Sequence, residues 1–293
     1  MHNEPILRRN AAPLIHPRNQ SIHTDAMNFH YSTTEQKTDA YALHCHPFYE
    51  IFYFVSGEVS YLVEGKPYVP RPGSILLIAP HVFHGVRIDS DRPYSRFALH
   101  FDARLLTLEN RTLLLSPFHT EDGPKDIYYP HADEYEMPNY FQQLMACGTM
   151  SEDMRDLTLK IRLEALLSQL LTMSRSSEAS SIRPAPSAKS IAMIIEYLNE
   201  HIAEHLTLDD ISSRFFLSKH HLNKVFRKAT GTTVGNYVIH KRVILAQQLL
   251  LQGQTAGFAS ASAGFRDYSV FYRAYKKIFG HAPSEGRSPL GLR

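Results

Sequence analysis

The sequence lacks the features that mark a secreted or membrane-embedded protein. Its 293 residues include only two cysteines, Cys45 and Cys147, which are too few for a disulfide framework. No apolar run approaches the roughly 18 residues that a membrane span needs, and the N-terminal stretch lacks the apolar core of a signal peptide. These absences predict a cytoplasmic protein without a membrane partner.

Motifs of common enzyme classes are absent as well. The chain has no Walker loop, no dinucleotide-binding glycine fingerprint and no Ser-His-Asp order of the kind that hydrolases use. We therefore expect no catalytic residues and a protein that binds rather than transforms its ligands.

Charge is distributed unevenly along the chain. The net charge is +2, but the residues from Lys189 onward comprise 14 basic and 7 acidic side chains, whereas those before it comprise 17 basic and 22 acidic ones. A length of 293 residues favours two domains. A basic C-terminal domain beside a mildly acidic N-terminal one is typical of a protein that binds a polyanion at one end.

The basic part shows one helix-turn-helix pattern twice, at about 207–229 and 255–279. Ser218 is placed to cap the second helix of the first unit, Asp267 is placed to cap that of the second, and Gly280 ends the latter. Residues 234–251 between the units read as one continuous helix. Its length of roughly 27 Å is close to the roughly 34 Å between successive major grooves on one face of DNA. The two units could therefore enter adjacent grooves of double-stranded DNA.

Each predicted recognition helix has a polar face suited to DNA, although a solvated helix face would look the same. Asn pairs with adenine and Arg with guanine in the major groove. The candidates for base contacts are His220, Asn223, Lys224, Tyr268, Ser269, Tyr272 and Arg273. The candidates for phosphate contacts, which raise affinity without reading sequence, are Lys219, Arg227, Lys228, Lys276 and Lys277.

These residues carry a resemblance to a known family. The pattern S-x-x-x-L-x-x-x-F-R-K-x-x-G at 218–231, followed by G-F-x-D-x-S-x-F-x-R-x-Y-K-K-x-x-G-x-x-P at 264–283, resembles the DNA-binding domain of AraC/XylS-family transcription regulators. The resemblance implies sequence-specific DNA binding, a homodimer, RNA polymerase as a partner, and activation as the usual outcome. Small residues at 255–263 depart from the family pattern. We therefore expect the second unit to be looser than the first, or to order fully only on DNA.

The N-terminal part has the texture of a β-domain. Short apolar or alternating runs at 50–55, 59–63, 74–78 and 97–101 are separated by turn residues, which predicts a sandwich or barrel. His44, His46 and Glu50, spaced H-x-H-x-x-x-E, and the segment from Pro72 to His84 resemble the two motifs of a cupin jelly roll. Many AraC-type regulators carry such a sensor domain before the DNA-binding domain.

The resemblance gives the histidines two interpretations. In metal cupins, residues at the positions of His44, His46, Glu50 and His84 hold one divalent metal, whereas sensor cupins of this family often work without metal. We expect no cofactor and a small sugar-like effector bound by His44, His46, Glu50, Tyr53, Tyr61 and His84. A metal-dependent cupin enzyme or metal sensor with an appended DNA-binding domain is the alternative. A constitutive architectural DNA-binding protein is a third interpretation.

Leucines at heptad-like spacing mark the helical segment after the β-domain: Leu159, Leu163, Leu166 and Leu170. They pack on the barrel, pair with a second copy, or the helix does both, with a second face formed by Leu157, Ile161, Leu167 and Leu171. The family resemblance makes the first four leucines candidate dimerisation residues. The expected fold is multidomain α+β. It comprises a flexible arm (1–24), a jelly-roll cupin barrel (25–135), dimerisation helices (136–174), a linker (175–188) and an all-α double helix-turn-helix domain (189–288).

Overall fold

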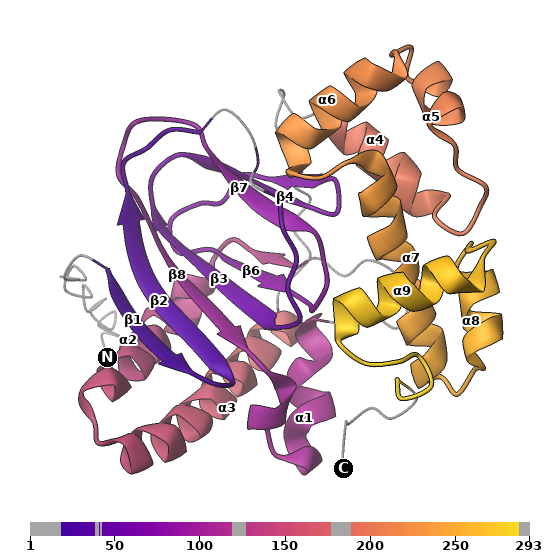
Figure 1. The fold of residues 1–293 in the computed structure, drawn as a ribbon. Helices are drawn as coiled ribbons and strands as arrows, with labels where there is room; N and C mark the ends of the chain where they lie inside the picture. The colour runs from indigo at the N-terminus through magenta and orange to yellow at the C-terminus, as the bar shows by residue number, and fades with distance from the viewer. Residues whose placement is uncertain (1–18, 39–40, 42, 119–126, 177–188, 287–293) are drawn as a thin grey trace, which may run out of the picture.

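The computed structural model describes residues 19–38, 41, 43–118, 127–176 and 189–286. These residues form a β-sandwich, helices that pack against one of its sheets, and a C-terminal helical domain beside β4 and β7 (Figure 1). The predicted multidomain α+β fold is confirmed.

The sandwich consists of a six-stranded and a three-stranded antiparallel sheet. The larger sheet contains, in spatial order, β1 (Gln20–Thr24), β2 (Met27–Thr34), β8 (Tyr94–Phe101), β3 (Tyr49–Ser56), β6 (Ile75–Ile78) and β9 (Tyr128–Tyr129). The smaller sheet contains β5 (Lys66–Tyr68), β4 (Val59–Val63) and β7 (His84–Ile88).

Alternation along β3 separates two cores, because successive side chains of a strand point to opposite faces. Phe52 and Phe54 face the smaller sheet and fill the interior of the sandwich. Tyr53 faces the other way and packs on Phe141, with the ring centroids 5.1 Å apart. The prediction that Tyr53 binds an effector beside Glu50 is therefore wrong, since the two side chains lie on opposite faces of one strand.

Helices cover the outer face of the larger sheet (Figure 1). They are α1 (Leu108–Leu115), α2 (Met137–Met145) and α3 (Glu152–Ser176), joined by the 3-10 turns η1 (Ala103–Leu105), η2 (Ser116–Phe118), η3 (Ala132–Tyr135) and η4 (Ala146–Thr149). The four leucines predicted to dimerise are each no more than 3% exposed and belong to the core between α3 and the sheet: Leu159, Leu163, Leu166 and Leu170. That dimerisation prediction is wrong, because packing within the chain occupies these side chains.

The predicted N-terminal arm extends too far. Residues 20–24 form β1, which pairs with β2 from Gln20 opposite Tyr31 to Thr24 opposite Met27. The rest of the predicted arm, residues 1–18, lies outside the described residues. The predicted linker also begins inside α3, which ends at Ser176, and residues 177–188 lie outside the described residues.

The C-terminal domain consists of six helices among the described residues. They are α4 (Lys189–Glu200), α5 (Leu208–Arg214), α6 (Lys219–Thr230), α7 (Val234–Leu251), α8 (Ala256–Ser262) and α9 (Tyr268–Phe279), and α7 covers the residues predicted for the spacer helix. None of the helices in the described part of the chain is both long and apolar enough to cross a bilayer.

Each helix-turn-helix unit has its own core. Leu222, Phe226 and Tyr237 belong to the first, and Phe271 and Tyr275 to the second. The first core also contains four side chains of the β-domain, namely Tyr41, Leu43, Leu62 and Phe83. The second unit buries less on α8, where Gly257 has no neighbour within 4 Å of a Cβ position and Phe258 is 53% exposed.

Candidate functional site

The recognition helix of the first unit, α6, presents a basic face. The Ser218 side chain caps it by accepting a hydrogen bond from the His221 amide at 3.2 Å, as predicted. Leu222 and Phe226 anchor the opposite side in the core. The polar side lines a groove of about 420 Å³, formed by Lys219, His220, Asn223, Lys224, Arg227 and Thr233. Five of these residues are predicted DNA contacts, so the fold gathers them on one surface.

Asn223 has a structural role in addition to its predicted base contact. Its side-chain oxygen accepts a hydrogen bond from the Val234 amide at 3.3 Å and so connects α6 to the start of α7. Pairing with adenine uses both the oxygen and the nitrogen of the amide group. Bidentate pairing by Asn223 would therefore compete with this hydrogen bond.

The recognition helix of the second unit, α9, repeats the arrangement. Asp267 caps it, with Oδ1 accepting from the Ser269 amide at 2.7 Å, and Gly280 ends it in the left-handed conformation at φ 79°. Phe271 and Tyr275 are buried. All predicted DNA contacts on this helix are exposed: Tyr268, Ser269, Tyr272, Arg273, Lys276 and Lys277.

Arg242 of α7 ties the two units together. Its guanidinium donates to the carbonyl oxygens of Ile202 at 2.9 Å and Glu204 at 2.6 Å, in the segment between α4 and α5. Gly264, in the turn of the second unit, has a φ of 88°, and a Cβ there would lie 2.7 Å from the Ala203 oxygen and 3.0 Å from Arg242 Nε. A side chain at this position would separate the two units, so the turn requires glycine.

The β-domain brings a second group of predicted residues together around Glu50. Glu50 lies on β3 directly opposite His100 of β8. His84 begins β7 and pairs through its backbone with His44, and His46 precedes β3. We call Glu50, His44, His46, His84 and His100 the histidine cluster.

The imidazoles converge on one carboxylate oxygen. Glu50 Oε2 lies 2.9 Å from His84 Nε2, 3.1 Å from His46 Nε2 and 3.4 Å from His100 Nε2. The Tyr61 hydroxyl donates to Glu50 Oε1 at 3.4 Å. Glu50 is 4% exposed and His84 is fully buried, whereas the His46 side chain is 17% exposed. The cluster is therefore closed on the Glu50 side and open to solvent at His46.

Comparisons with known proteins match both domains of the chain. The sequence pattern of the AraC-like ligand binding domain matches residues 28–183, more than half of the chain, and that of a helix-turn-helix domain matches residues 211–288. The chain belongs to the AraC family. It is a DNA-binding transcription regulator with a ligand-binding domain.

Relatives in this AraC family are similar over most of their length. The chain is 27% identical to the uncharacterized HTH-type transcriptional regulator YbfI of Bacillus subtilis, over 77% of this chain and 79% of that one. It is 24% identical to the HTH-type transcriptional activator RhaS of Escherichia coli, over 83% and 86%. Among solved structures, ToxT from Vibrio cholerae is 15% identical, with a TM-score of 0.38 over 89% of this chain and 97% of that one.

Backbone carbonyls fix the protons on two imidazoles of the histidine cluster. His46 Nδ1 lies 3.1 Å from the Phe48 oxygen, and His84 Nδ1 lies 2.8 Å from the Val82 oxygen. A carbonyl only accepts, so both Nδ1 atoms carry hydrogen, and in a neutral imidazole the Nε2 atom then presents a lone pair. Both lone pairs would face the Glu50 carboxylate, which repels them. The cluster therefore requires extra protons, a cation or donor groups of a ligand.

The cluster favours the ionised form of its carboxylate. Burial alone would raise the pKa of Glu50, but contacts from His100, His46 and His84 outweigh burial and hold that pKa well below its usual range. Burial opposes the charge on His84, yet the hydrogen-bonding and charge of Glu50 give its pKa a net rise. His84 Nε2 has no well-aligned hydrogen-bond acceptor despite lying 2.9 Å from Glu50 Oε2, so we attribute this effect mainly to charge.

The donor atoms also fit a metal ion. One ligand atom from each of His44, His46 and His84 lies within 4.8 Å of the others, and the same holds for His46, Glu50 and His100. Three or more imidazoles and a carboxylate are a ligand set for divalent transition metals. The Nδ1 hydrogen bonds of His46 and His84 to carbonyls are the kind of outer contacts that orient metal-binding histidines.

His100 was missed from the sequence, although a signal was present. In β8, Phe97, Leu99 and Phe101 face the helices, so Ala98 and His100 must face the interior. His30 of β2 stacks on His100 with the ring centroids 6.0 Å apart. The pKa of His30 is lowered to about 4, mainly by burial and further by the charges of Arg96 and His100. His30 therefore adds a neutral ring beside the cluster at pH 7.

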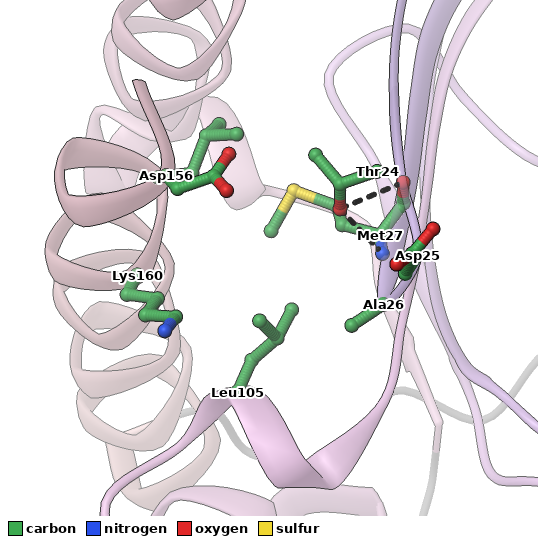
Figure 2. Close-up of a pocket in the computed structure, with 8 residues that line it drawn as sticks. Thr24, Asp25, Ala26, Met27, Leu105, Asp156 and Lys160 are labelled. Carbon is green, nitrogen blue, oxygen red and sulfur yellow. Dashed lines mark hydrogen bonds between the residues drawn. The ribbon is translucent and has the colours of Figure 1, made fainter. Parts of the chain in front are cut away.

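A separate cavity lies between the turn after β1 and α3. It measures about 180 Å³ and is lined by Thr24, Asp25, Ala26, Met27, Leu105, Asp156, Leu159 and Lys160. Figure 2 shows Asp156 and Lys160 on α3 facing the turn after β1 across this space. Leu105 lies at one end of the space, between α3 and the turn. It shares no residue with the histidine cluster.

Proposed function

We propose that this regulator activates transcription with RNA polymerase in response to a small polyhydroxylated effector, a sugar or sugar derivative, bound at the histidine cluster. The observation that carries the proposal is the convergence of the His46 and His84 Nε2 atoms on the buried Glu50 carboxylate. Hydroxyl groups donate to both kinds of acceptor, so a polyol would relieve the repulsion among them. The name of the relative RhaS, a transcriptional activator, supports activation.

The packing of the sandwich supports a small effector. Phe52, Phe54 and Tyr94 fill the interior beyond Glu50 and are each no more than 1% exposed. A ligand would therefore sit at the His44 and His46 end, where the cluster meets solvent. The named relatives are regulators, and we propose no catalytic activity.

A thermal-shift screen of monosaccharides with matched variants tests the effector proposal. A ligand at 100 times its Kd stabilises the native state by about 2.7 kcal/mol. We expect one sugar to raise the melting temperature of the wild type and of Tyr53→Phe, whose ring faces the helices, but not of Glu50→Gln. The same sugar should change the affinity for promoter DNA. Undiminished stabilisation of Glu50→Gln would refute binding at the cluster.

For DNA recognition, we propose that the N-terminal halves of α6 and α9 contact bases. His220, Asn223 and Lys224 would do so in the first unit, and Tyr268, Ser269, Tyr272 and Arg273 in the second. Lys219, Arg227, Lys228, Lys276 and Lys277 would contact phosphates. The exposure of these cationic side chains supports the assignment, although Lys219 also pairs with Asp209 at 2.6 Å in the free protein.

We also propose a homodimer, through a face of α3 other than that of the four buried leucines. Met154, Leu157 and Ile161 are 51%, 55% and 61% exposed and follow one another at helical spacing. An antiparallel pair of α3 helices related by a two-fold axis would bury these three apolar side chains.

A metal sensor is the second candidate, favoured by the same donor atoms. His44, His46, His84, Glu50 and His100 would hold a divalent transition metal, which would act as a cation neutralising Glu50. Elemental analysis of the purified chain tests it. About one metal per chain, lost in His44→Ala plus His46→Ala, would support the metal sensor, whereas metal-free protein that binds a sugar would support the polyol effector.

A further inference from the structure

The two domains meet at a partly buried carboxylate, Glu64, in the turn between β4 and β5. Its Oε1 accepts from the Phe83 amide at 2.8 Å and lies 2.9 Å from Lys241 Nζ of α7. Its Oε2 accepts from Asn199 Nδ2 of α4 at 3.0 Å and from the Tyr237 hydroxyl at 3.1 Å. Glu64 holds a φ of 48°, which a glutamate seldom adopts. A single side chain thus binds two helices of the DNA-binding domain.

Aromatic packing extends this contact to both helix-turn-helix units. The Phe83 ring centroid lies 4.7 Å from Tyr237 and 4.9 Å from His240. His81, at a φ of 62°, places its ring 5.0 Å from that of Phe279, the last residue of α9. Near the end of α6, a Cβ at Gly231 would lie 3.6 Å from the Leu43 oxygen. The β-domain therefore contacts the C-terminal ends of both recognition helices.

The same backbone carries the histidine cluster on its other side. Residues 44–46 and 81–84, which we call the ribbon, are joined by hydrogen bonds of 2.9 and 3.0 Å between His44 and His84 and of 2.8 Å from the His81 amide to the His46 oxygen. His46 and His84 direct their rings to Glu50. Cys45, next to His46, places Sγ 3.2 Å from His240 Nε2, and Phe83, next to His84, faces the DNA-binding domain.

We propose that the ribbon couples the histidine cluster to the docking of the DNA-binding domain, so that the contacts made to Glu50 hold the docking surface in shape. This inference builds on the proposed effector role of the cluster and names the route by which an effector acts. Close packing leaves these side chains little room to change rotamer, so a change in the spacing of His46 and His84 moves the shared backbone and, with it, Cys45 and Phe83. An occupant that draws His46 and His84 together therefore tightens docking.

Docking positions the recognition helices and does not cover them. The contacts of the β-domain fall at Gly231 and Phe279, after or at the last residue of each recognition helix. The predicted base-contacting residues on α6 and α9 occupy the other ends. Tighter docking would restrain both units at once and so fix how the two recognition helices are presented to adjacent grooves.

Alkylation of Cys45 in the full chain provides the test, because docking half-buries this thiol against His240. Cys147 is fully buried in the β-domain core and reports unfolding. Lys241→Met removes a docking contact and calibrates the assay. Glu50→Ala removes the group on which His46 and His84 converge and lies outside the interface. We expect it to speed Cys45 alkylation about tenfold, while Cys147 stays protected, because labelling follows the open population.

Matched variants separate coupling from general destabilisation. Leu99→Val, in the core on the helix side of β8, should leave Cys45 alkylation unchanged. His100→Gln, outside the ribbon, replaces Glu50→Ala should the latter expose Cys147. Wild-type alkylation rates in both cluster variants, with a fast rate in Lys241→Met, would overturn the proposal. The alkylation assay contains no effector, so its result can be interpreted even if no sugar binds in the thermal-shift screen. Conversely, unchanged alkylation rates would refute the coupling without refuting sugar binding.

Discussion

Replacing Glu64 by alanine should weaken the attachment of the DNA-binding domain without unfolding either domain. The side chain receives hydrogen bonds or charge from Phe83, Asn199, Tyr237 and Lys241, three of them in the C-terminal domain. Hydrogen bonds to charged groups contribute about 1.5–3 kcal/mol each to stability.

The expected loss is smaller than the sum of these contacts. The Glu64 and Lys241 side chains are 24% and 20% exposed, so water screens the attraction between their charges. The Tyr237 hydroxyl also retains Asn199 Oδ1 at 2.9 Å as a partner. We therefore expect Glu64→Ala to destabilise docking by about 3 kcal/mol, near the upper value for one charged hydrogen bond.

Urea denaturation followed by far-ultraviolet circular dichroism measures this effect, because helices α4 to α9 of the C-terminal domain contain more residues than α1, α2 and α3 of the β-domain together. Glu64→Ala should move the helical transition to lower urea than that of the wild type. The control is Glu58→Ala, which removes an exposed ion pair with Arg92 at 3.0 Å and should cost less than about 1 kcal/mol. Equal midpoints for the two variants would refute the role assigned to Glu64.

Three further results are expected. Arg273→Ala should relax sequence preference at one operator position, whereas Lys277→Ala should weaken binding to all sequences alike. Lys277→Ala should also lower the slope of log affinity against log salt concentration by about one, and fluorescence anisotropy measures both effects. An equal loss of affinity for all sequences in Arg273→Ala would make Arg273 a phosphate contact. Phe226→Ala, which empties a fully buried site in the first unit, should cost about 3–5 kcal/mol in thermal unfolding; a cost under 1 kcal/mol would mean that the site collapses. Leu157→Asp plus Ile161→Asp should convert dimers to monomers in analytical ultracentrifugation, and persistent dimers would place the interface elsewhere.

The sequence was most informative where local rules decide the structure. The spacer helix α7 begins at Val234 and ends at Leu251 as predicted, and the Ser218 and Asp267 caps form as predicted. Capping and helical periodicity involve residues within a few positions of one another, so tertiary context changes them little. Strands β3 and β4 follow the same rule, since apolar runs and turn residues bound them.

Predictions failed where the partner of a surface had to be known. The leucines of α3 have the spacing of an apolar stripe, but spacing does not tell whether a sheet or a second chain covers it. Tyr53 failed for a simpler reason, because it lies an odd number of residues from Glu50 on one strand and must face away from it. His100 joined the cluster only through strand pairing between β3 and β8, which are far apart in the sequence.

The mixed core of the first helix-turn-helix unit limits how this protein can be divided or recombined. Tyr41, Leu43, Leu62 and Phe83 belong to the β-domain in sequence but complete a core of the DNA-binding domain in space. A fragment that starts at Lys189 would expose the faces that these side chains cover and should aggregate more readily than the whole chain. A chimera that joins the sensor of one relative to the DNA-binding domain of another would meet the same apolar surface with mismatched side chains. Such exchanges should succeed only when these four residues are transplanted together with the helices they cover.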